Sequence, residues 1–273
     1  MSKSARLRAE DWRAILQLVG ECRELGDEKA LWRRHLLERL ASRVGADLAF
    51  CQELAGLRAG RPADHGAEVW GFQNGFDAGV QREIHRKVDR DPTLYGALIA
   101  YFRRQAAEDG VSLSRREVLD DASWYRSPGH ELIHLPLGVD HALYCFRSMP
   151  DTRDDASSGL LLFRESGRRD FSPRAAAIVE EAHRALAPLV GGPLARLAEP
   201  SPMGLPPRVR QVLACLLEGD SDKQVALRLS MSAYTVNEYT KLIYRHFGVR
   251  SRPELLAQWV RRGRGSPPAW LDD

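Results

Sequence analysis

The chain has 273 residues, 44% of them hydrophobic and 28% charged, which is an ordinary composition for a soluble globular protein. No run of about 18 apolar residues occurs, which excludes a transmembrane helix, and the N-terminus lacks the apolar stretch of a secretory signal. The four cysteines are scattered without a C-x-x-C pair, which favours free thiols. We therefore expect a cytoplasmic protein of one or two domains, without a cofactor or a membrane partner.

The N-terminal two thirds of the chain are predicted to be an α+β domain covering residues 1–192. Apolar residues recur at helical spacing between residues 10 and 44, which predicts helices there. Near position 171, Ser172 and Pro173 form an N-cap followed by proline at the first helical position, which predicts a long helix. Three strands are predicted, at residues 47–54, 140–146 and 159–163.

This order of helices, strands and a closing helix resembles the GAF/PAS-type α+β sensor fold. The resemblance is one of pattern, and it implies a pocket over an antiparallel sheet that binds a small-molecule effector. The side chains that we consider as ligand-binding candidates are Trp70, Tyr101, Trp124 and His134. The alternative, that such residues belong to an ordinary core, stays open at this point.

Two other kinds of sensor fit the sequence less well. A receiver domain needs an acidic pair after its first strand in a repeating βα array, whereas Asp120 and Asp121 lie in the middle of the chain. Autoinducer-binding domains place Trp and Tyr shortly before an Asp-Pro pair. The pair Asp91-Pro92 is present, but the nearest Trp before it is Trp70 and no Tyr lies between. Binding of an acyl-homoserine lactone is therefore not favoured.

Residues 130–134, HELIH, spell the H-E-x-x-H pattern of zinc proteases. Such a site needs both histidines on a stable helix, but Pro136 leaves at most a turn and a half. A third ligand is also required, and His141 follows one residue too late for the extended motif. We therefore expect no catalytic residues, no bound metal and no enzyme activity. A zinc-dependent hydrolase using His130, Glu131 and His134 is the alternative.

A change in composition and charge separates a second module from the first. Residues 193–204 are rich in proline and lack an apolar period, which predicts a linker. Residues 205–264 contain eleven Lys and Arg against five Asp and Glu, whereas the rest of the chain has 29 basic and 32 acidic residues. A small basic module beside a slightly acidic one favours binding to a polyanion. Residues 265–273 form a tail.

Four short helices are predicted in this basic module. Helical apolar spacing begins after Pro206 and Pro207 and ends at Gly219. Capping-box patterns at residues 221–224 and 251–254 begin the second and fourth helices. Ser232 is the expected N-cap of the third, which presents Val236, Ile243 and Phe247 inward and ends at Gly248. Short capped helices with a four-residue turn between the second and third are typical of a helix-turn-helix module.

Residues 205–256 are similar along their length to the DNA-binding domain of LuxR-type transcriptional regulators. The segments carrying the similarity are LPPRVRQVL, GDSDKQVA, LSMSAYTVNEY and HFGVRSR. The resemblance implies a transcriptional regulator that reads the major groove of double-stranded DNA as a homodimer. It places base contacts at Asn237, Glu238 and Lys241, whose side chains suit adenine, cytosine and guanine respectively. Phosphate contacts are expected from Lys223, Tyr234, Thr235 and Arg245.

Some positions depart from the family pattern. Asn237 replaces a Lys or Arg and Tyr239 replaces a His on the reading helix, so the operator sequence cannot be taken from relatives. These two departures also leave open a protein-interaction adaptor that has lost DNA binding. On the fourth helix, Trp259 is a candidate for a dimer contact, with burial in the core as the alternative.

Overall fold

The computed structural model describes residues 6–55, 63–71, 83–84, 86–87, 90–91, 94, 96–105, 109–149, 156–197 and 199–261. The chain divides into two compact units. One consists of Met1–Cys22 and Ala30–Pro188, and the other of Arg23–Lys29 and Leu189–Asp273. None of the helices in the described ranges has the length and apolar character that crossing a membrane requires.

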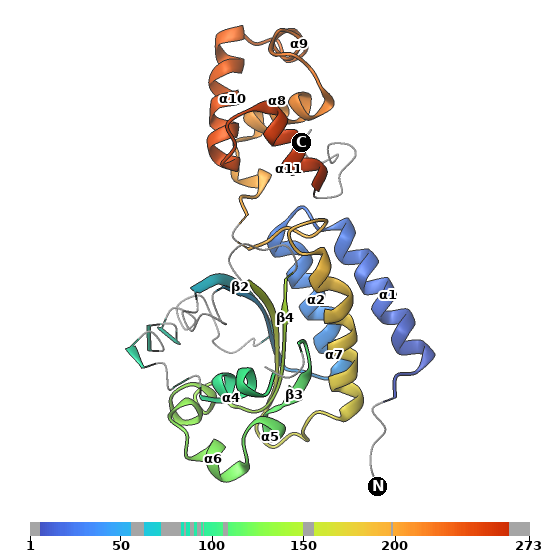
Figure 1. Cartoon of the computed structure of the whole chain (residues 1–273), viewed down its shortest axis with the longest axis vertical. Helices are drawn as coiled ribbons and strands as arrows, with labels where there is room; N and C mark the ends of the chain where they lie inside the picture. Colours follow the sequence, from blue (N-terminus) through green and yellow to red (C-terminus); the bar gives the residue numbers. More distant parts are fainter. Residues whose placement is uncertain are drawn as a thin grey trace. The chain divides into compact units, whose positions relative to one another are not determined.

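A five-stranded antiparallel sheet with the strand order β2-β1-β5-β4-β3 forms the centre of the first unit (Figure 1). Its strands are β1 (Leu48–Ala55), β2 (Ala63–Gly71), β3 (Ser112–Ser114), β4 (Val139–Ser148) and β5 (Ser157–Glu165). The three central strands confirm the three that the sequence predicts. The edge strands were missed because β3 has only three residues and β2 lacks the alternation of apolar and polar residues that marks a half-buried strand.

The central strands are buried on both faces, which explains their nearly continuous apolar runs. The helices α1 (Ala9–Glu24), α2 (Lys29–Val44) and α7 (Pro173–Leu186) lie along one face, and α4 (Gly96–Gln105) lies on the other (Figure 1). The short helix α5 (Arg115–Val118) contributes Val118 to the core on the α4 side, together with Tyr144 and Phe146 of β4. As predicted, α7 begins after Ser172, whose hydroxyl accepts a hydrogen bond from the amide of Ala175.

Buried ion pairs connect the helices to one another and to the sheet. Asp11 of α1 is fully buried and accepts hydrogen bonds from Arg43 of α2 at 2.7 Å and from Arg174 of α7 at 2.9 Å. Burial opposes the ionisation of Asp11, but the hydrogen bonds from Arg174, Arg8 and Arg43 outweigh it and lower its pKa. A second buried pair joins Arg33 of α2 to Glu53 of β1. The partners lie far apart in sequence, so a local pattern could not reveal either pair.

The second unit contains the four helices predicted for the basic module. They are α8 (Pro207–Glu218), α9 (Asp222–Arg228), α10 (Ala233–Phe247) and α11 (Arg252–Arg261). Gly219 and Gly248 end α8 and α10 with φ values of 102° and 65°, in the left-handed region that favours glycine. All four helices contribute to one apolar core.

Trp259 of α11 belongs to this core. Its exposed fraction is 5%, so Trp259 is a core residue of this domain. This burial corrects the idea that Trp259 forms a dimer contact. The reason is the helical period, which turns Leu255 and Trp259 to the same side of α11. Val260, at 66% exposed, faces outward on α11.

The segment predicted as a linker makes defined contacts. The amide of Ala195 donates to the carbonyl of Gly26 at 2.8 Å, and the Lys29 ammonium donates to the carbonyl of Leu197 at 2.9 Å. Gly26 has no room for a side chain, because a Cβ there would lie 2.1 Å from the carbonyl oxygen of Pro193. The predicted tail, residues 265–273, lies outside the described residues.

The close packing of Gly159 in β5 gives a test of the sheet. A Cβ at this position would lie 2.2 Å from the ring of Phe146 on the neighbouring strand. Because the ring is itself enclosed in the core, we expect Gly159→Ala to lower the free energy of unfolding by about 1–3 kcal/mol. Urea denaturation followed by near-ultraviolet circular dichroism measures the change.

The matched control is Gly20→Ala on α1. A Cβ at this exposed helical glycine meets no atom within 4 Å. Since alanine is the better helix former, Gly20→Ala should raise the free energy of unfolding by up to about 1 kcal/mol. Equal effects of the two substitutions would contradict the packing of Phe146 on Gly159.

Candidate nucleic-acid interface and apolar pocket

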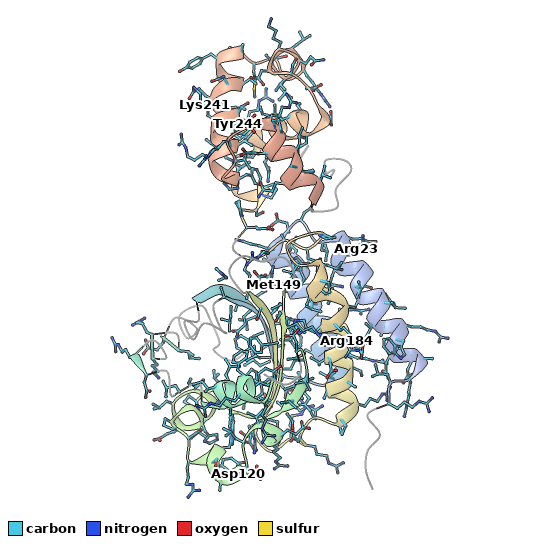
Figure 2. All side chains as sticks on the ribbon, in the orientation of Figure 1. Arg23, Asp120, Met149, Arg184, Lys241 and Tyr244 are labelled. Atoms are coloured by element: carbon cyan, nitrogen blue, oxygen red, sulfur yellow. The ribbon has the colours of Figure 1, made fainter. Side chains whose placement is uncertain are left out.

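The orientation of α10 follows from its buried stripe. Val236, Thr240, Ile243 and Phe247 are buried and recur at helical spacing, with α8 and α9 packed against this helix. The opposite side is therefore left to solvent. In Figure 2, the side chain of Lys241 extends outward from α10. The other predicted contact residues on this helix that are exposed are Tyr234, Asn237, Glu238 and Arg245.

The start of α10 is held by local hydrogen bonds. The hydroxyl of Ser232 accepts from the amide of Thr235 at 3.0 Å, which confirms the predicted N-cap. The hydroxyl of Thr235 is itself hydrogen bonded to that of Ser232 at 2.8 Å, and the residue is half-buried. Tyr234 is 77% exposed beside it. In the preceding turn, Ser230 has a φ of 51°, which lets four residues connect α9 to α10.

Two of the predicted base-contacting residues bind each other in the free protein. The Lys241 ammonium donates to the Glu238 carboxylate at 2.8 Å, one helical turn away, and this hydrogen bond raises the pKa of Lys241. Both side chains are largely exposed, at 62% and 46%. An exposed pair of this kind is weak because water competes for both partners. Each of the two side chains can therefore leave this ion pair and bind a polar group of another molecule instead.

The cations of this unit differ in how they are held. Arg228 binds Glu218 and Asp220, and Arg208 donates to the carbonyl of Leu229 at 2.8 Å. By contrast, within the described ranges the side chains of Lys223 and Arg245 are exposed and form no ion pair. Their charges are thus available to an external anion.

An apolar pocket lies in the first unit, on the face of the sheet that carries α4. It has a volume of about 100 Å³, and its walls come from β1, β2, β4, β5, α4 and the segment around His134. Its lining residues, as far as the structure describes them, carry no formal charge. They are Leu48, Phe50, Gln52, Ala67, Ile84, Leu94, Ala97, Leu98, Ile133, His134, Leu137, Val139, Tyr144, Leu161 and Phe163.

The four predicted ligand-binding residues occupy different places. His134 lines the pocket. Trp124 packs against His134, with 4.6 Å between the centroids of the two rings. Tyr101 is buried in the core, where its hydroxyl donates to the carbonyl of Val111 and accepts from the amide of Phe146. Trp70 is half-buried on β2. Among the described residues, the pocket walls thus include only His134 of these four.

Two buried polar atoms on residues that line the pocket lack a partner within the described structure. These are the hydroxyl oxygen of Tyr144 and Nδ1 of His134. An unpaired buried polar group costs about 1–3 kcal/mol, so each is unusual in a folded protein. Burial lowers the pKa of His134 to about 3, and the adjacent His130 adds to this effect. Tyr144 was not among the predicted ligand-binding residues, although alternation along the predicted strand at 140–146 places it on one face with Ala142 and Phe146.

The HELIH segment forms a single π-helical turn, η2 (His130–His134). The imidazoles of His130 and His134 both lie against Trp124, at centroid distances of 5.5 and 4.6 Å. His141 lies on β4, where its Nε2 is hydrogen bonded to the carbonyl of Arg168 at 2.9 Å. In the ranges that the structure describes, no three His, Cys, Asp or Glu side chains are grouped to hold a metal ion.

The acidic pair considered for a receiver domain has structural partners. The side chain of Asp120 accepts from the amide of Ser123 and caps the short helix α6 (Asp121–Tyr125). Asp121 binds the buried guanidinium of Arg115. Arg115 also lies 3.4 Å from Asp140, whose carboxylate accepts hydrogen bonds from Trp124 and Tyr125.

Comparison with known proteins identifies the second unit. Residues 203–258 match the family "Bacterial regulatory proteins, luxR family". This segment is a LuxR-family helix-turn-helix domain, which confirms the resemblance found in its sequence. A similar curated protein is the probable HTH-type transcriptional regulator GfsR of Streptomyces halstedii, which is 32% identical over 71 residues. The match covers 26% of this chain and 29% of GfsR.

Two solved structures overlap with the chain loosely. Escherichia coli SdiA is 17% identical with a TM-score of 0.44, and the alignment covers 92% of this chain and 98% of SdiA. Vibrio cholerae VqmA, a LuxR-type receptor, is 19% identical with a TM-score of 0.24, and the alignment covers 48% of this chain and 52% of VqmA.

The two buried tyrosines on this side of the sheet should respond differently to loss of the hydroxyl group. Tyr101→Phe leaves the carbonyl of Val111 and the amide of Phe146 without their partner, so we expect it to lower the free energy of unfolding by about 1–3 kcal/mol. Tyr144→Phe removes an unpaired hydroxyl, so its effect on the ligand-free protein should lie within about 0.5 kcal/mol of zero or be stabilising. Urea denaturation of both variants checks the contrast, which a larger loss for Tyr144→Phe would refute.

Proposed function

We propose that this protein is a DNA-binding regulator of transcription and that α10 enters the major groove. The observation that supports this most directly is the exposed side of α10 in a LuxR-family helix-turn-helix domain. Burial of Val236, Ile243 and Phe247 leaves a polar surface on the other side of the helix. An α-helix fits the major groove, where base edges can be read by hydrogen bonds.

The proposed contacts fall into two groups. Asn237, Glu238 and Lys241 read base edges, after the ion pair between Glu238 and Lys241 opens. Phosphate contacts fix the register of the protein on the duplex without reading sequence. They are assigned to Lys223, Tyr234, Thr235 and Arg245, of which Lys223 and Arg245 supply unpaired charges.

We assign the control of DNA binding to the first unit. Its antiparallel sheet and apolar pocket support a GAF/PAS-like sensor that responds to a small-molecule effector. The regulator acts in the cytoplasm as a homodimer. Two copies related by two-fold symmetry would read an operator with matching symmetry.

A salt titration separates the two groups of contacts. Lys223→Ala should reduce the slope of log K against log salt concentration by about 1, since one fewer phosphate is neutralised, and should weaken all sequences alike. Lys241→Ala should instead reduce discrimination at one base pair by about 1–3 kcal/mol. Fluorescence anisotropy with sequences selected from a random DNA pool measures both quantities.

Arg228→Ala is the matched control for loss of a cation. Its guanidinium is already bound by Glu218 and Asp220, so the salt slope should stay within about 0.3 of the wild-type value. Failure of the full-length protein to enrich any sequence from the pool would reject the proposal and favour the protein-interaction adaptor.

A further inference from the structure

The two unpaired polar atoms at the pocket contrast with similar groups elsewhere in the same unit. Tyr101 lies in the same apolar cluster as Tyr144, yet its hydroxyl has two hydrogen-bond partners at 2.8 and 2.9 Å. His183 of α7 is buried on the other face of the sheet. Its two nitrogens lie 3.3 Å from the Cys145 thiol and 3.2 Å from the Ser158 hydroxyl. This phenol and this imidazole are therefore paired, although both are buried.

Tyr144 and His134 line one pocket. Tyr144 lies on β4 and is 2% exposed, and its hydroxyl has no partner in the described structure. Nδ1 of His134 is enclosed in the same way. Unpaired polar atoms are expected to acquire a partner where a cavity allows it, because pairing recovers the cost of their burial. Their shared location suggests a bound group that meets both.

We propose that the pocket binds a small, uncharged, mostly hydrocarbon molecule whose single hydroxyl or carbonyl group is hydrogen bonded by the Tyr144 hydroxyl and by Nδ1 of His134. This proposal rests on the sensor role proposed for the first unit, and it defines the chemical class of the effector. The other lining residues that the structure describes are apolar apart from Gln52, which matches the hydrocarbon part.

The protonation states of the two residues match an uncharged ligand. Burial keeps His134 neutral by lowering its pKa to about 3, and burial raises the pKa of Tyr144 above its ordinary range. The described groups whose charges act on the pKa of His134 are His130 and Asp140, and neither is among the described residues that line the pocket. Against the walls that the structure describes, a carboxylate or an ammonium would thus lose its hydration without gaining a counter-ion.

The donors and acceptors also limit the polar group. Tyr144 offers one O–H donor, and a neutral imidazole has one donor nitrogen and one acceptor nitrogen. A carbonyl oxygen accepts from Tyr144, and from Nδ1 when Nδ1 carries the proton. A hydroxyl group accepts from Tyr144 and donates to Nδ1 in the other tautomer. The pocket volume of about 100 Å³ is smaller than the cavity of about 150 Å³ that holds benzene, which limits the ligand to a small molecule.

The test uses the full-length protein at pH 7 and four probes of equal chain length. Hexan-1-ol and hexan-2-one carry the proposed polar group, whereas hexanoate and hexylammonium are charged. Ligand-observed NMR titration gives Kd for each. We expect the alcohol and the ketone to bind at least about tenfold more tightly than the charged probes, and Tyr144→Phe and His134→Phe each to weaken the alcohol by about two- to tenfold.

Tyr125→Phe is the matched control, because it removes a hydroxyl that is bonded to Asp140 outside the pocket wall. Its Kd for the alcohol should equal that of the wild type. A crystal structure with hexan-1-ol should show the probe hydroxyl within hydrogen-bond distance of both atoms. Binding of none of the probes, equal binding of all four, an unchanged Kd in Tyr144→Phe, or ordered water alone in the pocket would overturn the proposal.

DNA binding measured on the same preparation separates this proposal from the function on which it rests. Loss of probe selectivity with intact, salt-dependent DNA binding refutes the ligand class alone. Selective probe binding without any DNA binding refutes the regulator and leaves the chemistry of the pocket standing.

Discussion

Burial of one side of α10 is the constraint on which the functional surface depends. Val236, Thr240, Ile243 and Phe247 pack into the core of the helix-turn-helix domain, and the helical period then directs Asn237 and Lys241 to solvent. Caps at both ends define the length of this helix. A substitution that disturbs the buried stripe would therefore turn the reading residues away from DNA without changing any of them.

The sheet of the first unit separates two kinds of environment. On the side of α1, α2 and α7, the buried carboxylate of Asp11 is matched by Arg43 and Arg174. On the side of α4, the walls are apolar and two polar atoms have no partner in the described structure. The first face stabilises the fold, and the second provides the features that a ligand would recognise.

Similar residue types serve different purposes in these environments. The hydroxyl of Tyr101 is part of the hydrogen-bonding framework, whereas that of Tyr144 is unpaired at the pocket. The HELIH segment likewise shows how little a motif implies without its context. Its two histidines lie on one π-helical turn against Trp124, and His134 supplies a neutral polar atom to an apolar wall.

The sequence by itself determined the local features of this protein: the four helices of the second unit, their caps at Ser221 and Ser232, the outward residues of α10 and the three central strands. Capping, helical periodicity and glycine stops act between residues a few positions apart, so a linear pattern contains them. The tertiary structure alone decided the edge strands β2 and β3, the buried pair of Arg33 and Glu53, and the meeting of His134 and Tyr144 at one pocket. Those features depend on which distant segments become neighbours, and folding settles this by burying the largest apolar surface with the fewest unpaired polar groups.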